Sequence, residues 1–114
     1  MRLEVFENLQ EILQRGVDIQ VFVSTMTFED YTKDARTRLA VERAFEIIGE
    51  ALNRSSRLAP ELTESIPNYR KVISFRNILA HCYDSIEDRL VWGFIEGFLP
   101  QLLDAVQKLI QAES

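Results

Sequence analysis

The chain has few cysteines, glycines and prolines, and it has no long apolar run. One cysteine among 114 residues excludes an internal disulfide bond and suits a reducing cytosol, so we expect a cytoplasmic protein. The four glycines and three prolines leave room for long regular elements. No apolar run approaches the roughly 18 residues that a membrane span requires, and the N-terminal MRLEVFENLQ lacks the apolar core of a signal peptide. We therefore expect no membrane association.

A zinc-binding pattern and an excess of positive charge are also missing. The single histidine and single cysteine offer no zinc-ligand spacing, and we expect no metal or other cofactor. The formal net charge is −5, whereas nucleic-acid-binding proteins are more often basic, because phosphate contacts supply much of their affinity. The segment from Arg54 to Arg76 differs, since its five basic and two acidic residues give it a charge of +3 and leave −8 for the rest. Such a patch fits a small anionic substrate or a short strand better than a long duplex.

The length and the hydrophobic pattern predict one helical domain over residues 1–114. The hydrophobic fraction of 46% is ordinary for a globular protein, and no window shows the alternation of a strand. We expect an all-α, up-and-down bundle of four or five helices. We also expect short turns at Phe28–Tyr31 and Glu61–Ser65. The expected helices are Leu3–Ser24, one from a cap at Asp34 or Thr37 to Ser56, Tyr69–Tyr83, one from a cap at Asp84 or Ser85 to Phe98, and a segment that follows a kink or a new start at Pro100.

The first two expected helices carry apolar stripes. In the first helix, we expect the buried face to be Leu3, Phe6, Leu9, Leu13, Val17 and Val21, with Gly16 as a weak point. The second has two adjacent stripes, which predict burial against more than one neighbour. They are Ala40, Ala44, Ile47 and Ala51, and Val41, Phe45, Ile48 and Leu52.

Glu42, Glu46 and Glu50 follow one another at four-residue spacing on the polar side of the second expected helix. Two interpretations remain open for them. They form a solvated acidic face, or one of them meets an arginine across a helix or subunit interface.

The stretch RNILAHCYD, Arg76–Asp84, holds the only histidine and the only cysteine of the chain. On a helix, Asn77 and His81 share a face, whereas Arg76 and His81 lie about 140° apart around the axis. One straight helix therefore aims Arg76 and His81 poorly at a common atom. Either the helix ends at His81, or two copies of it face each other so that each site is shared, which favours a two-fold symmetric homodimer.

These side chains are adequate for RNA cleavage without a metal. His81 can exchange a proton near neutral pH, Arg76 can hold a phosphate, and Asn77 can orient a substrate group or the imidazole. Tyr83 can stack on a base or donate a hydrogen bond. In such a reaction the 2′-hydroxyl attacks the adjacent phosphate, and the arginine stabilises the transition state. From spacing alone the alternatives stay open: a structural histidine at a helix end, a tyrosine that closes the bundle, and Cys82 as a packing residue.

The stretch matches R-x-x-x-x-H-x-Y, with an asparagine directly after the arginine, and so resembles the signature of HepT-type proteins of the HEPN superfamily. The resemblance extends to two further segments. AVERAFEIIGEAL (Ala40–Leu52) is similar to the second helix of that family, and LVWGFIEGFLPQLLDAV (Leu90–Val106) is similar to its final helix.

The resemblance implies an all-α fold and a two-fold homodimer whose motif helices line a cleft between the subunits. It implies a toxin of a prokaryotic toxin–antitoxin pair that cleaves RNA without metal. The partner would be a minimal nucleotidyltransferase antitoxin that silences the toxin by transferring AMP to the motif tyrosine. By position, Arg76, Asn77 and His81 would be the catalytic residues and Tyr83 the AMP acceptor. Cys82 departs from the family, which usually has glycine there. Glycine permits a left-handed turn after the histidine, whereas cysteine favours continued helix or an extended exit, which would shift the position of Tyr83.

Two hypotheses for the function follow. The chain is an RNase toxin, or it is a non-catalytic helical dimer that binds a nucleotidyltransferase partner or a nucleotide through the motif surface.

Overall fold

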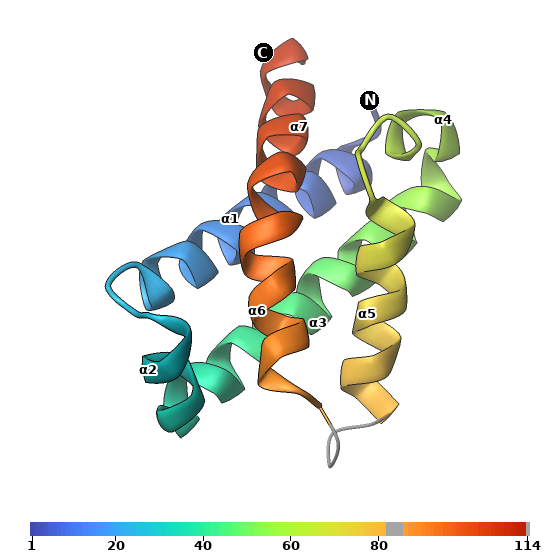
Figure 1. Ribbon diagram of the computed structural model, residues 1–114. Helices are drawn as coiled ribbons and strands as arrows, with labels where there is room; N and C mark the ends of the chain where they lie inside the picture. The colour runs from blue at the N-terminus through green and yellow to red at the C-terminus, as the bar shows by residue number, and fades with distance from the viewer. Residues whose placement is uncertain (82–85, 114) are drawn as a thin grey trace.

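A computed structural model describes residues 1–81 and 86–113 of the chain (Figure 1). These residues contain helices and no strand, which confirms the all-α prediction. Five helices have ten or more residues, and two are short. They are α1 (Leu3–Val23), α2 (Phe28–Lys33), α3 (Ala35–Leu58), α4 (Pro60–Thr63), α5 (Tyr69–His81), α6 (Asp88–Gly97) and α7 (Leu99–Ala112).

Helix α3 lies at the centre of the arrangement. It packs against α1 along one side and against α5 along another, so the prediction that it is buried against more than one neighbour is confirmed. Helices α1 and α3 run in opposite directions, and α6 and α7 form a column that crosses in front of them (Figure 1). Helix α5 runs down beside this column toward the segment that joins it to α6. None of the helices in the described residues has the length and apolar character that crossing a membrane requires.

The helix boundaries follow local signals in most places. Asp34, rather than Thr37, is the N-cap of α3: its carboxylate accepts a hydrogen bond of 3.0 Å from the backbone N–H of Thr37. Hydrogen bonds from the backbone and side chain of Thr37 lower the pKa of the Asp34 carboxyl. Pro100 lies in the first turn of α7, where a proline is tolerated, so the predicted new start near Pro100 is confirmed.

The predicted start of the helix after the motif is wrong. Helix α6 begins at Asp88 with Glu87 as its N-cap, and residues 86 and 87 are not helical. The proposed caps, Asp84 and Ser85, lie outside the described residues. Asp88 instead forms an ion pair with Arg38 of α3, and this contact with another helix has no signal in the local sequence.

The predicted buried face of α1 is also wrong, except at Leu9, which is the only one of its six residues that is buried. Leu3 is 71% exposed and Val21 is 63% exposed. Apolar residues occur on more than one side of α1, and its packing against α3 and α7 selects a different side. Gly16 belongs to the buried side, because a Cβ atom there would overlap the side chain of Leu103 in α7. The buried residues of α1 are Val5, Leu9, Ile12, Gly16, Ile19 and Val23.

A cluster of phenylalanines fixes the motif helix in the core. Phe75 of α5 stacks on Phe94 of α6 with the ring centroids 4.1 Å apart, and it meets Phe45 of α3 edge to face at 5.2 Å. Such aromatic pairs contribute about 0.5–1.5 kcal/mol beyond the area that they bury. Because Phe75 directly precedes Arg76, this cluster determines the direction in which the motif side chains leave the helix.

Candidate active site

Helix α5 presents its apolar side to the core and its motif residues around the remaining surface. Val72, Phe75 and Leu79 are buried at helical spacing. Asn77 and His81 are exposed on the opposite side, and Arg76 is half-buried between the two sides. The described part of α5 ends at His81, and Cys82 and Tyr83 lie outside the described residues.

Arg76 is held by a carboxylate oxygen and a side-chain amide oxygen. Its Nη2 donates to Oε1 of Glu50 on α3 at 3.4 Å, and its Nη1 donates to Oδ1 of Asn77 at 2.9 Å. Its Nε atom is buried and has no hydrogen-bond partner among the described residues. The interpretation that one of the regularly spaced glutamates meets an arginine across a helix interface is therefore confirmed for Glu50.

The approach of α5 to α3 at this point depends on a glycine. A Cβ atom at Gly49 would overlap Cβ and Cγ of Arg76. Gly49 thus allows the stem of Arg76 to lie directly on the backbone of α3, while the adjacent Glu50 holds the guanidinium. The small residues of α3 predicted a close helix approach in general terms, but the pattern did not single out Gly49.

The other two glutamates of the series have different surroundings. Glu46 pairs with Arg43 of the same helix at 3.0 Å. Glu42 lies close to Asp88, and burial together with this neighbouring charge raises the pKa of the Glu42 carboxyl. The three glutamates therefore have different surroundings in spite of their equal spacing. Glu46 is in a pair within its own helix, Glu50 is in a pair between helices, and Glu42 is a partly buried acid.

His81 does not meet Arg76 within one chain. Its side chain is exposed and forms no hydrogen bond or ion pair with another described residue, whereas Arg76 turns toward α3. This agrees with the angular separation of about 140° that helical spacing gives for these two positions. The structure therefore brings Arg76, Asn77 and Glu50 together and leaves His81 on the neighbouring exposed side.

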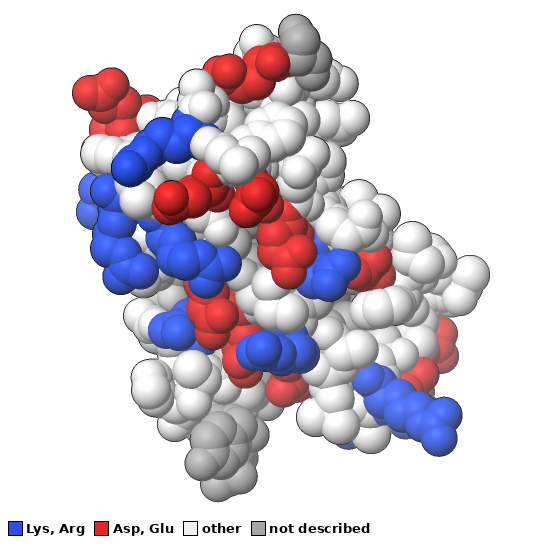
Figure 2. Space-filling model, turned by 180° about the vertical axis from the view of Figure 1, so that it is seen from behind, with Lys and Arg blue, Asp and Glu red and all other residues white. Residues whose placement is uncertain are grey.

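Basic side chains gather at the start of the motif helix, at the end that is remote from His81. Arg54 and Arg57 lie on the last turns of α3, and Arg70 and Lys71 lie on the first turns of α5. Figure 2 shows basic side chains on its left half, the side of α5 and of the end of α3, with acidic side chains interleaved among them. The local positive charge that the sequence predicts thus lies on the surface that carries the motif helix.

The arrangement can bind and polarise a phosphate. A guanidinium that is oriented by a carboxylate and an amide keeps donors available for anionic oxygens, and charge-assisted hydrogen bonds of this kind are about twice as strong as neutral ones. A neighbouring imidazole that faces solvent can exchange protons with a bound ligand.

Comparison with known proteins identifies the family. The model of the family described as "Ribonuclease HepT-like" matches residues 9–109. The chain belongs to this HepT-like family. The resemblance that the motif indicated is thereby confirmed, and it extends over nearly the whole chain.

Similar proteins of this family occur in archaea and bacteria. The chain is 33% identical over 105 residues to a protein of Thermococcus cleftensis named "Probable ribonuclease HepT", with 89% of this chain and 91% of that protein covered. It is 31% identical over 101 residues to a Methanocaldococcus jannaschii protein (87% and 90% covered), and 30% identical over 105 residues to a Caldanaerobacter subterraneus protein (92% and 93% covered). Both bear the name "Putative RNase". No solved structure matches the chain at a significant level.

Proposed function

We propose that this HepT-like chain is a metal-independent endoribonuclease whose site is formed by Arg76, Asn77 and His81. The observation that carries the proposal is the half-buried Arg76, oriented by Glu50 and Asn77, together with an exposed histidine one to two turns further along the same helix. The family and the names of its members support a ribonuclease by resemblance.

Each residue has a role in this reaction. The 2′-oxygen of the substrate forms a bond to the adjacent phosphorus, and the bond from phosphorus to the 5′-oxygen breaks. His81 takes the proton of the 2′-hydroxyl or supplies a proton to the departing 5′-oxygen. Arg76 stabilises the negative charge that gathers on the phosphoryl oxygens of the transition state. Asn77 fixes Arg76 through its Oδ1 and positions the substrate through its amide group.

The site is shared between two copies of the chain in this proposal. Arg76 and His81 point in different directions on one helix, so a second α5 facing the first would bring an arginine and a histidine to one phosphate. Ile78, which lies between the motif residues on α5, is 40% exposed, and an apolar contact with a second copy would cover it. Sedimentation equilibrium should give twice the monomer mass, and a monomer that retains cleavage activity would exclude the shared site.

We further propose that the chain is the toxin of a toxin–antitoxin pair, silenced by a minimal nucleotidyltransferase that transfers AMP from ATP to Tyr83. The motif tyrosine and the family support this proposal. Co-expression with such a partner should add the mass of one AMP to the peptide that contains Tyr83, and Tyr83→Phe should remove the adduct. An adduct at another residue, or none, would exclude Tyr83 as the acceptor.

The ribonuclease proposal is tested with RNA in EDTA. The purified wild-type protein should cleave a single-stranded RNA and leave a cyclic phosphate end. His81→Ala should lower the rate by roughly a hundredfold or more, the usual contribution of general acid–base catalysis. Equal cleavage by both proteins, or cleavage by neither, would instead favour a non-catalytic interaction module that binds a nucleotidyltransferase or a nucleotide.

A further inference from the structure

A polar stripe runs along the exposed side of α5. Arg70, Ser74, Asn77 and His81 follow one another at spacings of four, three and four residues, and all four are exposed. The stripe is about 16 Å long at the rise of an α-helix. A nucleic-acid strand rises about 3.4 Å per nucleotide when it is helical and more when it is extended, so this length corresponds to a few nucleotides.

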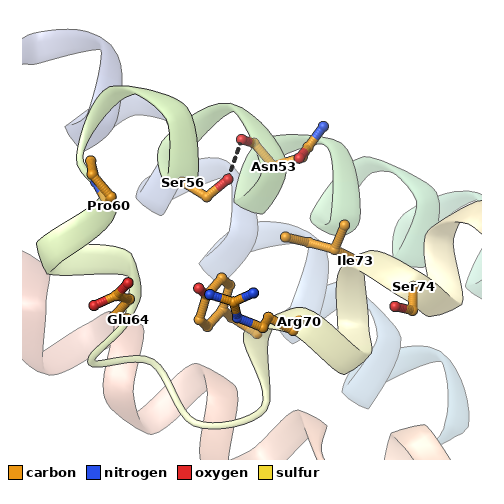
Figure 3. A pocket seen from close by; sticks show the side chains of 8 residues that line it. Asn53, Ser56, Pro60, Glu64, Arg70, Ile73 and Ser74 are labelled. Carbon is orange, nitrogen blue, oxygen red and sulfur yellow. Dashed lines mark hydrogen bonds between the residues drawn. The ribbon is translucent and has the colours of Figure 1, made fainter.

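The end of the stripe remote from His81 opens into a hollow of about 500 Å³. Helix α3 bounds it on one side, α4 and the following loop on another, and α5 on the third (Figure 3). Arg70 and Glu64 reach into the hollow from opposite walls, and Ser74 lies at its edge toward the motif (Figure 3). The hollow is thus continuous with the stripe that leads to His81.

The lining of the hollow is suited to a nucleotide. Arg70 lies over the ring of Tyr69, 5.4 Å from its centroid, and bases stack on both kinds of group. The side chains of Asn53, Glu64 and Arg70 form no hydrogen bond or ion pair with another described residue, so their polar atoms remain available to a ligand. Ser56 donates its own hydroxyl proton to the backbone carbonyl of Asn53 at 2.7 Å and can accept a further hydrogen bond.

The charged side chains of the hollow favour one orientation of a bound nucleotide. The Glu64 carboxylate repels a phosphate and accepts hydrogen bonds from the N–H groups of a base. Arg70 and Ser74, on the α5 side, can donate to a phosphate. A nucleotide would therefore place its base toward Glu64 and Asn53 and its phosphate toward α5, in line with the stripe.

We propose that this hollow is a subsite for single-stranded RNA, a few nucleotides away from the bond that is cut, in which a base stacks on Tyr69 and Arg70 holds the phosphate of that nucleotide. The proposal rests on the proposed ribonuclease function and adds to it a specificity for substrate length. RNA that is too short to reach from His81 to the hollow gains nothing from it.

The test compares a dinucleotide with an RNA of about eight nucleotides, which is longer than the stripe. Tyr69→Leu and Arg70→Gln should each raise KM for the longer RNA about tenfold, the order expected for the loss of one stacked base or of one charge-assisted phosphate contact. Cleavage of the dinucleotide should be unchanged in both variants, which also shows that they are folded. Tyr69→Phe keeps the ring and should behave as the wild type.

A matched control removes a positive charge elsewhere. Lys108 of α7 is exposed and pairs only with Asp104 on its own helix among the described residues, so Lys108→Gln should leave KM for both RNAs unchanged. Equal KM values of wild type, Tyr69→Leu and Arg70→Gln for the longer RNA would overturn the subsite. An equal loss for the dinucleotide and the longer RNA would also overturn it.

A binding measurement separates this proposal from the ribonuclease proposal. A fluorescein-labelled 2′-O-methyl RNA of about eight nucleotides has no free 2′-hydroxyl and is not cut. If its affinity falls about tenfold in Arg70→Gln while no His81-dependent cleavage is found, the subsite stands and the ribonuclease proposal fails. If cleavage depends on His81 and the affinity is unchanged, the subsite fails alone.

Discussion

Among the described residues, two arginines form ion pairs between helices, and they differ in what surrounds them. Arg76 of α5 meets Glu50 of α3 at 3.4 Å, and Arg38 of α3 meets Asp88 of α6 at 3.3 Å. The four side chains are 23–36% exposed. Partly exposed pairs of this type usually contribute about 0–1 kcal/mol, so neither pair explains the stability of the fold.

The two pairs differ in the groups beside them. Arg38 also donates to the backbone carbonyl of Thr32 at 3.0 Å, and it lies beside the buried Tyr31, whose hydroxyl has no partner among the described residues. This junction joins α2, α3 and the first turn of α6. The guanidinium of Arg76 instead donates a hydrogen bond to the exposed Asn77, which is part of the polar stripe of α5. The same kind of ionic contact therefore joins three helices at one junction, and at the other it orients the arginine that we propose to be catalytic.

The largest effect on stability should come from the glycine beneath Arg76. Gly49→Ala places a Cβ atom against Cβ and Cγ of Arg76, so α5 must move away from α3. We expect the free energy of unfolding to fall by about 1–3 kcal/mol, as for other overpacked interiors. Urea titration followed by circular dichroism measures this change.

Gly93 of α6 is the matched control. A Cβ atom there meets nothing within 4 Å, so Gly93→Ala should stabilise the protein by roughly 0.5–1 kcal/mol through helix propensity alone. If both alanine variants unfold at the same urea concentration as each other, the contact between Gly49 and Arg76 is not tight.

The next largest effect should be on kcat, and it should distinguish the Arg76–Glu50 pair from the Arg38–Asp88 pair. Glu50→Gln removes the charge that holds Arg76. Because a small displacement of a positioning group can cost up to about a hundredfold in rate, we expect kcat for RNA cleavage to fall at least about tenfold. The change in the free energy of unfolding should stay below about 1 kcal/mol.

Asp88→Asn breaks the other pair and should cost a similar amount of stability, but it should leave kcat unchanged. If both variants lower kcat equally, the functional distinction between the two junctions is lost. Urea titration of both proteins shows that their stabilities match before the rates are compared.

The sequence predicted the junction at Arg76 better than the junction at Arg38. The glutamate series, the small residues of α3 and the motif all lie in regular helices, where spacing determines direction, so an interhelix partner for an arginine was foreseeable. The junction at Arg38 joins residues that are far apart in the sequence. The start of α6 at Asp88 was missed, because its partner Arg38 is 50 positions away.

Tertiary packing also decided what periodicity left open. Helix α1 has apolar residues on several sides, and the face that includes Leu3 and Val21 was as regular as the face that is buried. Packing against α3 and α7 selected the buried side, and the small volume of Gly16 allowed it. Glycines at close helix contacts carry no pattern of their own, so Gly16 and Gly49 are recognised only once the neighbouring helix is placed.

The smallest effect on stability should come from Tyr31, which is part of the junction at Arg38. Its side chain is fully buried, burial and the charges of Glu42 and Asp88 raise the pKa of its hydroxyl, and that hydroxyl donates to no described group. Tyr31→Phe keeps the ring against Trp92, 5.4 Å away, and removes only the unpaired oxygen. Removing a buried polar group without a partner is neutral or favourable, so the free energy of unfolding should stay the same or rise by up to about 1 kcal/mol. If urea titration shows that the free energy of unfolding falls by more than about 1 kcal/mol, the hydroxyl has a hydrogen-bond partner in solution. The Arg38 junction would then be a hydrogen-bonded network of the kind found at Arg76, and the contrast between the two would rest only on the exposed motif residues of α5.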